Sequence, residues 1–406
     1  MKRALSSAAA IAAAISVAQT AAAQNCYENK SQCFSFAPEP SEASRLDTGI
    51  NLRSKTLSVT GDIRFRLRAD DSAAGYPYAD GDQMTSRARV QMAYQATENA
   101  KAVIEFNYSE TWSGSNGYSD AQPGENWNGV SQAYIEVEDM FGAEDKWRVG
   151  RSNYTLANGL ILGSCDYLQY PDTFTGAWVS RKFGDHDLEL FVLDDDGPLQ
   201  SPRPATRFIG ATGKLNLSED GPVGTIGAFY MQGTGDGDNT NGTFSNDRWY
   251  GAQGTGKLPL ELLWSAEAAQ RQVDGGKDVA AYRVRIERKF EGIVDSVSFT
   301  RTDSEGALHV NPADFNSAGL LHMYGGAWRS DLDTNQLQVS LRPGCDFDVD
   351  VTMLTLDRDG TATQLGDFET DIVVGKQLKS GVHASAAYGF DNDYRQVAFL
   401  QLTLFF

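Results

Sequence analysis

The sequence predicts an all-β protein, a transmembrane antiparallel up-and-down β-barrel of about 18 strands. The final stretch, Tyr394 to Phe406, is the first observation, because every second residue from Ala398 to Leu404 is apolar. The same alternation recurs from residue 57 onward, and the chain holds 40 Gly, 16 Tyr and 20 Phe but only 12 Pro. Many short strands in one closed sheet fit this composition. A strand that is apolar on one face also fits a soluble β-sandwich, which remains the alternative.

The N-terminus predicts export from the cytoplasm. Lys2 and Arg3 precede a small apolar run that ends at Ala21-Ala22-Ala23, as in a secretory signal peptide. No apolar run of transmembrane-helix length follows. We therefore expect a signal peptide over 1–23, a periplasmic N-terminal extension over 24–56 and an outer-membrane β-barrel over 57–406, located in the bacterial cell outer membrane.

The first predicted strand, Leu57 to Ala69, is apolar on one face and basic on the other. The apolar residues are Ile63, Phe65 and Leu67, and the basic residues are Arg64, Arg66 and Arg68. Three arginines without partners would be costly in a soluble core. In a barrel they face a lumen while the apolar face meets lipid.

The alternation predicts 18 strands, closed by pairing of the first with the last. The expected ranges are about 57–69, 84–96, 101–109, 132–137, 146–152, 173–183, 186–193, 205–217, 223–232, 248–257, 260–271, 279–290, 294–302, 335–342, 346–356, 366–378, 382–390 and 394–406. An even number places both termini on the periplasmic side. Residues 321–330 fit either a further strand or a long outer loop.

Aromatic residues recur near the expected strand ends, where we expect them at the two bilayer interfaces. They include Tyr108, Trp112, Trp147, Trp178, Tyr230, Tyr388 and Phe405.

The formal net charge is -19, which argues against nucleic acid as a partner. Most of the acidity falls in the expected outer loops, whereas arginines recur at inward strand positions. We expect these arginines to line the pore and bind the solute: Arg64, Arg66, Arg68, Arg87, Arg89, Arg148, Arg151, Arg283 and Arg285. In the alternative, they only pair with Glu105, Glu136, Asp348 and Asp350 and brace the wall.

The sequence shows no pattern of catalysis, and we expect neither an enzyme nor a cofactor nor a metal site. The four histidines have no metalloprotease spacing, and no nucleophile elbow is present. Residues 236–247 depart from a calcium loop at Asn241 and Asp247. We expect Cys26 and Cys33 to form a disulfide in an oxidising compartment, with free or otherwise paired thiols as the alternative.

Several short motifs resemble the alginate export family of outer-membrane porins. They are GDIRFRLR at 61–68, SRAR at 86–89, AYIEV at 133–137, RVGR at 148–151, LILG at 160–163 and FTG at 174–176. The resemblance implies an 18-stranded monomeric barrel with an arginine-rich conduit for an acidic polysaccharide. The chain departs from the family pattern at Ser152, where a Gln is usual, and at Thr175, where an acidic residue is usual.

These observations predict an outer-membrane channel for anionic solutes, such as an acidic polysaccharide or oligouronate of the alginate type. Passage is by passive diffusion or through an exit conduit. The alternative is an adhesin or structural barrel with an occluded lumen and acidic surface loops. Expected partners are outer-membrane lipid, lipopolysaccharide, the anionic solute and, through the C-terminal strand, the barrel assembly machinery; we expect no nucleic acid and a monomer.

Overall fold

The structure is a computed structural model. It describes residues 50–52, 55–70, 83–114, 127–142, 144–157, 159–163, 173–195, 206–218, 220–234, 244, 246–305, 320, 332–344, 347–357, 368–378, 381–392 and 395–406. The predicted signal peptide, the four cysteines and residues 321–330 lie outside the described residues, as does most of the loop over 236–247.

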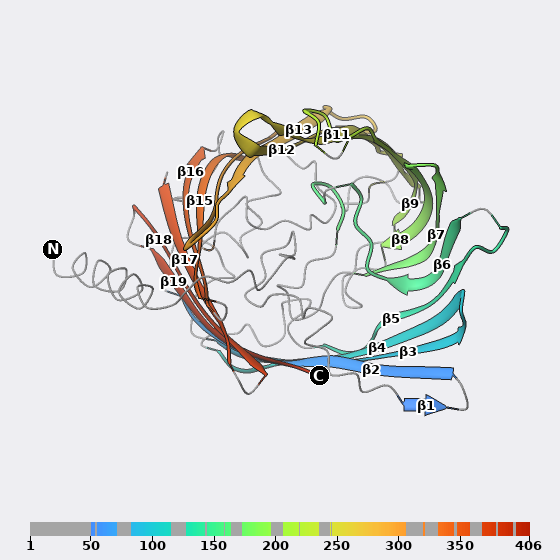
Figure 1. Ribbon diagram of the computed structural model, residues 1–406, viewed down its shortest axis with the longest axis horizontal. Coiled ribbons are helices and arrows are strands. Elements are labelled where there is room, and N and C mark those ends of the chain that lie inside the picture. Colours follow the sequence, from blue (N-terminus) through green and yellow to red (C-terminus); the bar gives the residue numbers. More distant parts are fainter. Residues whose placement is uncertain are drawn as a thin grey trace.

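Eighteen antiparallel strands, β2 to β19, form a closed barrel (Figure 1). Their bounds are β2 Lys55–Asp70, β3 Gln83–Thr97, β4 Ala100–Gly114, β5 Trp127–Glu138, β6 Asp145–Ser152, β7 Phe174–Phe183, β8 His186–Asp195, β9 Thr206–Asn216, β10 Thr225–Thr234, β11 Arg248–Leu258, β12 Leu262–Gln272, β13 Val279–Lys289, β14 Val294–Ser304, β15 Leu332–Gly344, β16 Phe347–Asp357, β17 Phe368–Gln377, β18 Val382–Asp391 and β19 Gln396–Phe405. Each predicted strand corresponds to one of these, so the fold class and the strand count are confirmed.

The barrel closes between β2 and β19, as predicted. Phe65 lies opposite Leu402, and Arg66 lies opposite Gln401. Phe406 extends this pairing, since its N–H donates to the Gly61 carbonyl at 3.0 Å and its carbonyl accepts from the Gly61 N–H at 2.7 Å. A methyl group on Gly61 would overlap both the Arg89 carbonyl and the Phe406 ring. Gly61 is therefore required at this seam.

One additional strand lies in the region predicted to be an irregular extension. β1 (Ile50–Leu52) pairs with the start of β2 as a short hairpin. Among the described residues, β1 pairs with β2 alone, so it does not form part of the closed barrel wall.

The two faces of the strands are assigned as the alternation predicted. Ile63, Phe65 and Leu67 are 37%, 40% and 47% exposed on the outer face, whereas Arg64 and Arg66 between them are buried. On β19 the outward residues Leu400, Leu402 and Leu404 are likewise exposed, and Gln401 and Thr403 are buried. A closed barrel with this pattern presents its apolar side to lipid.

Two of the aromatic residues predicted at the bilayer interface face inward instead. Trp178 is buried among lumenal side chains, and Phe405 lies opposite the inward-facing Asp62. Proximity to a strand end does not reveal the face, which parity along the strand decides. Trp112 and Tyr230 do lie exposed on the outer face.

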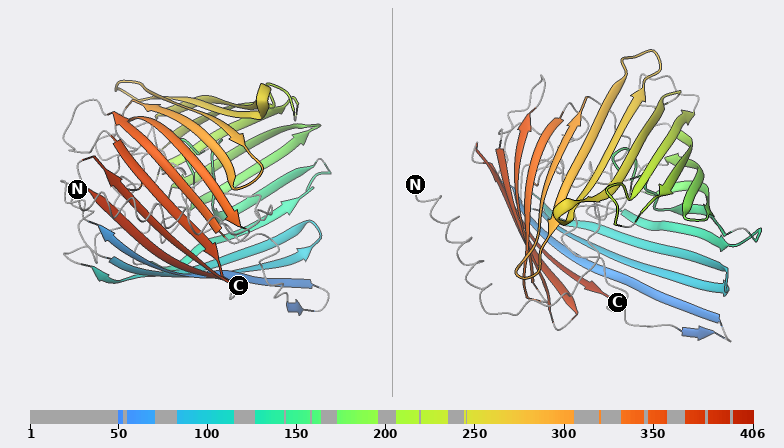
Figure 2. Two further views of the ribbon diagram at one scale, coloured as in Figure 1. Left: turned by 60° about the vertical axis from the view of Figure 1, so that its left-hand side comes forward. Right: turned by 45° about the horizontal axis from the view of Figure 1, so that its top comes forward.

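The two ends of the barrel differ in their connections. At one end, the turn end, β3 and β4 are joined by 98–99 and β7 and β8 by 184–185. At the other, the loop end, β2 and β3 are joined by 71–82 and β14 and β15 by 305–331. The strands run strongly tilted between these ends (Figure 2). Among the described residues, no helix has the length and hydrophobicity of a membrane span.

Candidate functional site: the two walls of the lumen

A basic wall is formed by the inward faces of β19, β2 and β3. The register places Arg64 directly opposite Arg87 and Asp62 opposite Arg89. Successive inward residues stand about 6.8 Å apart along a strand, and neighbouring strands about 4.8 Å apart. Five guanidiniums, those of Arg64, Arg66, Arg68, Arg87 and Arg89, therefore share one compact patch, which we call the arginine ladder.

Asp62 holds two members of the arginine ladder. Its Oδ1 accepts from Arg87 Nη2 at 2.8 Å and from Arg87 Nε at 3.1 Å, and its Oδ2 accepts from Arg89 Nε at 2.6 Å. Asp62 and Arg87 are 2% and 1% exposed. The sequence predicts braces at Glu105, Glu136, Asp348 and Asp350 but does not reveal Asp62, because the register between β2 and β3 cannot be read from a single strand.

The remaining members of the ladder contact β19. Arg66 Nε donates to Gln401 Oε1 at 2.9 Å, and the Arg68 guanidinium lies 5.7 Å from the centre of the Phe399 ring. Arg64 lies opposite Thr403. The ladder thus faces inward as predicted, but Arg64, Arg66 and Arg68 are only 2%, 3% and 6% exposed. The sequence predicts that these arginines face water in the lumen, whereas in the structure their side chains are buried by packing.

Arg148 is also inward and is held on three sides. It pairs with Glu136, and its guanidinium lies 4.4 Å from the Tyr134 ring centre and 4.7 Å from that of Trp178. Lys101 and Lys146 also bind Glu136, at 2.7 and 3.0 Å. Here the predicted bracing role of Glu136 is confirmed.

Arg151 does not belong to the inward set. It lies opposite Ala133, on the same face of β6 as the outward Val149, and its Nε donates to Thr173 Oγ1 at 2.8 Å. Arg148 and Arg151 are three residues apart, and an odd spacing places two residues on opposite faces of a strand. The prediction that Arg151 lines the pore is therefore wrong.

Arg283 and Arg285 on β13 face inward, since Tyr282, Val284 and Ile286 are exposed on the outer face. Arg283 lies 3.6 Å from Glu267, and Arg285 lies 3.2 Å from Glu287. Asp348, another of the four predicted braces, pairs with Arg342 at 3.2 Å. Arg285 is 40% exposed, so it is far more accessible than the ladder.

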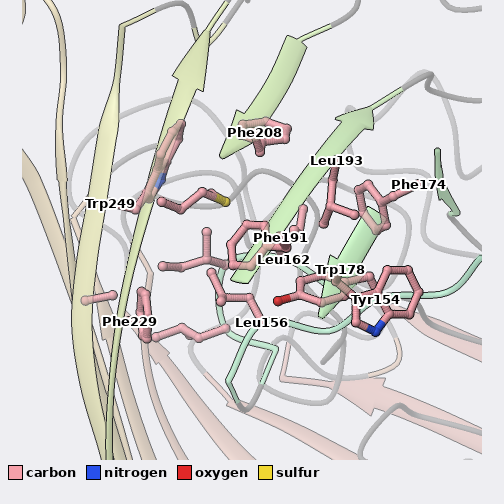
Figure 3. Packing of buried hydrophobic residues seen from close by; sticks show 14 of the residues in the cluster. Tyr154, Leu156, Leu162, Phe174, Trp178, Phe191, Leu193, Phe208, Phe229 and Trp249 are labelled. Atoms are coloured by element: carbon pink, nitrogen blue, oxygen red, sulfur yellow. The ribbon is translucent and has the colours of Figure 1, made fainter. Parts of the chain in front are cut away.

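An apolar wall faces inward from β7 to β11. Its side chains are Phe174, Trp178, Phe191, Leu193, Phe208, Phe229, Met231 and Trp249, all buried. The connection after β6 folds into the lumen and packs on them through Tyr154, Leu156, Leu160, Ile161 and Leu162 (Figure 3). We call residues 153–163 the inward segment.

Tyr154 anchors the inward segment. Its hydroxyl donates to Glu189 Oε1 at 2.7 Å, and its ring packs against Trp178 and Phe191 with centre distances of 5.5 and 5.1 Å. Burial, and then the charge of Glu189, raises the pKa of the Tyr154 hydroxyl well above its usual value. The hydroxyl therefore remains a donor across the physiological pH range.

Sequence reasoning missed the inward segment, although a signal was present. From Leu190 to Leu193, β8 is apolar at every position, so both faces need an apolar environment. Lipid covers the outer face, and the inward segment covers the other. No group of three or more His, Cys, Asp or Glu in the described part of the chain is arranged to hold a metal ion.

A family model described as "Alginate export" matches residues 55–285. The search of curated proteins found no match. Solved structures supply the comparison of the fold. A BenF-like porin from Pseudomonas fluorescens Pf-5 is 13% identical with a TM-score of 0.65, and the match covers 87% of this chain and 99% of that one.

Two structures from Pseudomonas aeruginosa show the same architecture. OpdQ is 13% identical with a TM-score of 0.60, covering 87% of this chain and 99% of that one. OccK2 (OpdF), solved in complex with glucuronate, is 12% identical with a TM-score of 0.57, covering 87% and 98%. At such identities the likeness establishes the fold. The chain is an outer-membrane β-barrel whose exposed apolar face contacts membrane lipid.

Proposed function

The chain belongs to the alginate export family, and on that premise we propose that it conducts anionic solutes across the outer membrane. The solutes are acidic polysaccharides or oligouronates of the alginate type, which cross by passive diffusion or leave through an exit conduit. Family and structural neighbours are channels rather than enzymes. We also propose that the channel acts as a monomer and is inserted through pairing of its C-terminal strand by the assembly machinery.

The observation that carries this proposal is the grip of Arg87 and Arg89 on the Asp62 carboxylate. Guanidinium binds carboxylate through parallel charge-assisted hydrogen bonds and stays charged at all relevant pH values. A uronate offers the same carboxylate group as Asp62. The glucuronate bound by OccK2 supports the choice of ligand class.

The test replaces Arg64, Arg66 and Arg87 by Gln together and measures the reversal potential in a salt gradient, with oligouronate added. We expect weaker anion selectivity and weaker block by oligouronate. The control removes three outward-facing arginines near the loop end of their strands, Arg207→Gln, Arg248→Gln and Arg301→Gln, and should change neither. Unchanged selectivity in the correctly folded lumenal variant would contradict the proposal.

A second function, an adhesin or structural barrel with an occluded lumen, is favoured by one observation. Arg64, Arg66, Arg68 and Arg87 are at most 6% exposed. Planar-bilayer recording of the refolded wild-type protein separates the two functions, because an occluded barrel gives no steady conductance.

A further inference from the structure

A cavity of about 860 Å³ lies at the turn end of the lumen, away from the arginine ladder. Its walls are residues of β7 to β13 and of the turns between them. The volume falls within the range of about 300 to 1,000 Å³ that is usual for small-molecule sites.

Five of the lining residues form one row across neighbouring strands. Asn216 lies opposite Thr225, Thr225 opposite Thr255, Thr255 opposite Ser265, and Ser265 opposite Arg285. Opposed residues share a face of the sheet, and neighbouring strands stand about 4.8 Å apart. The row therefore presents an amide, three hydroxyls and a guanidinium at regular spacing. The Thr225 and Thr255 hydroxyls are joined by a 2.7 Å hydrogen bond.

The cations of this cavity are accessible, unlike those of the ladder. The side chains of Arg285 and Lys257 are 40% and 36% exposed. Lys182 is exposed too, and within the described part of the chain its side chain makes no ion pair. Three carboxylates, those of Asp185, Asp187 and Glu287, also line the cavity. The charges of the cavity therefore balance, and its distinguishing feature is the row of hydroxyls that ends at the Arg285 guanidinium.

We propose that this cavity binds a sugar acid at the turn end of the channel, which short turns assign to the periplasmic side. Hydroxyl and amide side chains exchange hydrogen bonds with sugar hydroxyls, and the Arg285 guanidinium binds the sugar carboxylate. The inference rests on the proposed function and adds to it a specific binding site for the uronate. Arg285 determines selectivity for the acid, and Thr255 and its neighbours recognise the sugar.

The test compares Arg285→Gln with Lys146→Gln in planar bilayers of the refolded full-length barrel. Lys146 is a matched control, because it is an inward cation of similar exposure (38%) that does not line the cavity. With oligouronate added at the turn end, Arg285→Gln should raise the half-blocking concentration about tenfold, as expected for the loss of one charge-assisted hydrogen bond. Lys146→Gln should stay close to wild type. Thr255→Val should weaken block by oligouronate and by a neutral glucose oligomer alike, about fivefold.

Binding of oligouronate to the detergent-solubilised barrel, measured by saturation-transfer NMR, separates this inference from the proposed function. If oligouronate block is lost in the variant with Gln at positions 64, 66 and 87 but is unchanged in Arg285→Gln, the cavity is not a binding site and the proposed conduit stands. If the protein has no conductance but binds oligouronate in an Arg285-dependent way, the proposed conduit is wrong and the binding site in the cavity stands. Equal binding of the glucose oligomer and the oligouronate by wild type overturns the assignment to a sugar acid.

Discussion

The basic wall of β19, β2 and β3 and the apolar wall of β7 to β11 have similar outer faces and opposite inner faces. Outside, Phe65 on one and Leu190 on the other are exposed to 40% and 50%. Inside, one wall carries the arginine ladder and the other carries the aromatic residues under the inward segment. Lipid imposes one requirement on every strand, whereas the lumenal residues are free to differ and determine what the lumen contains.

The largest effect is expected from breaking the basic wall at its centre. Asp62→Asn leaves Arg87 and Arg89 without their shared carboxylate in a buried setting, and removal of one partner from a buried pair costs about 3 to 5 kcal/mol. Urea-dependent unfolding of the refolded barrel in lipid vesicles measures this. A loss below about 1 kcal/mol, the range of exposed pairs, would mean that Asp62 is not the brace of this wall.

The apolar wall is tested by Leu162→Ala, which removes a fully buried side chain of the inward segment. Leu-to-Ala changes in packed cores cost about 2 to 5 kcal/mol. Here the loss should loosen the inward segment, and we expect faster proteolysis within 153–163 and a larger, noisier open-channel current. Leu190→Ala on the outer face of the same wall is the control and should leave the current unchanged. A wild-type current in Leu162→Ala would contradict the packing role of the segment.

The similarity of the outer faces is tested by introducing arginine on both walls. Phe65→Arg and Leu190→Arg should each cost about 2 to 4 kcal/mol near the bilayer midplane. Gln91→Arg, at an inward position of β3, should cost little. Refolding yield by heat-modifiable mobility and urea titration give these values. Equal tolerance of arginine at Phe65 and Gln91 would mean that the register assigned to β2 or β3 is wrong by one residue.

The smallest effect is expected at an exposed ion pair. Arg207 binds Asp194 through two hydrogen bonds of 2.7 and 3.1 Å on the outer face, with 57% of the Arg207 side chain exposed. Exposed pairs contribute about 0 to 1 kcal/mol, so Arg207→Gln should change the unfolding free energy far less than Asp62→Asn. A comparable loss in both would show that burial is not what separates the two pairs.

The alternation of apolar and polar residues is enough to predict the barrel, the strand count and the inward direction of eight arginines: Arg64, Arg66, Arg68, Arg87, Arg89, Arg148, Arg283 and Arg285. A period of two is local, and it can be read from a single strand. The same rule places Arg151, three residues after Arg148, on the outer face, and the register of β6 agrees.

Which inward residues contact one another depends on the registers between strands, and these are known from the fold alone. Asp62 stands between Arg87 and Arg89 because of the β2–β3 register, and the row from Asn216 to Arg285 exists because five strands align. The sequence of the inward segment predicts only a loop, and its buried position follows from its packing against the apolar inner faces of β7 to β11. Registers and cross-lumen packing depend on residues far apart in sequence, so the alternation within one strand carries no information about them.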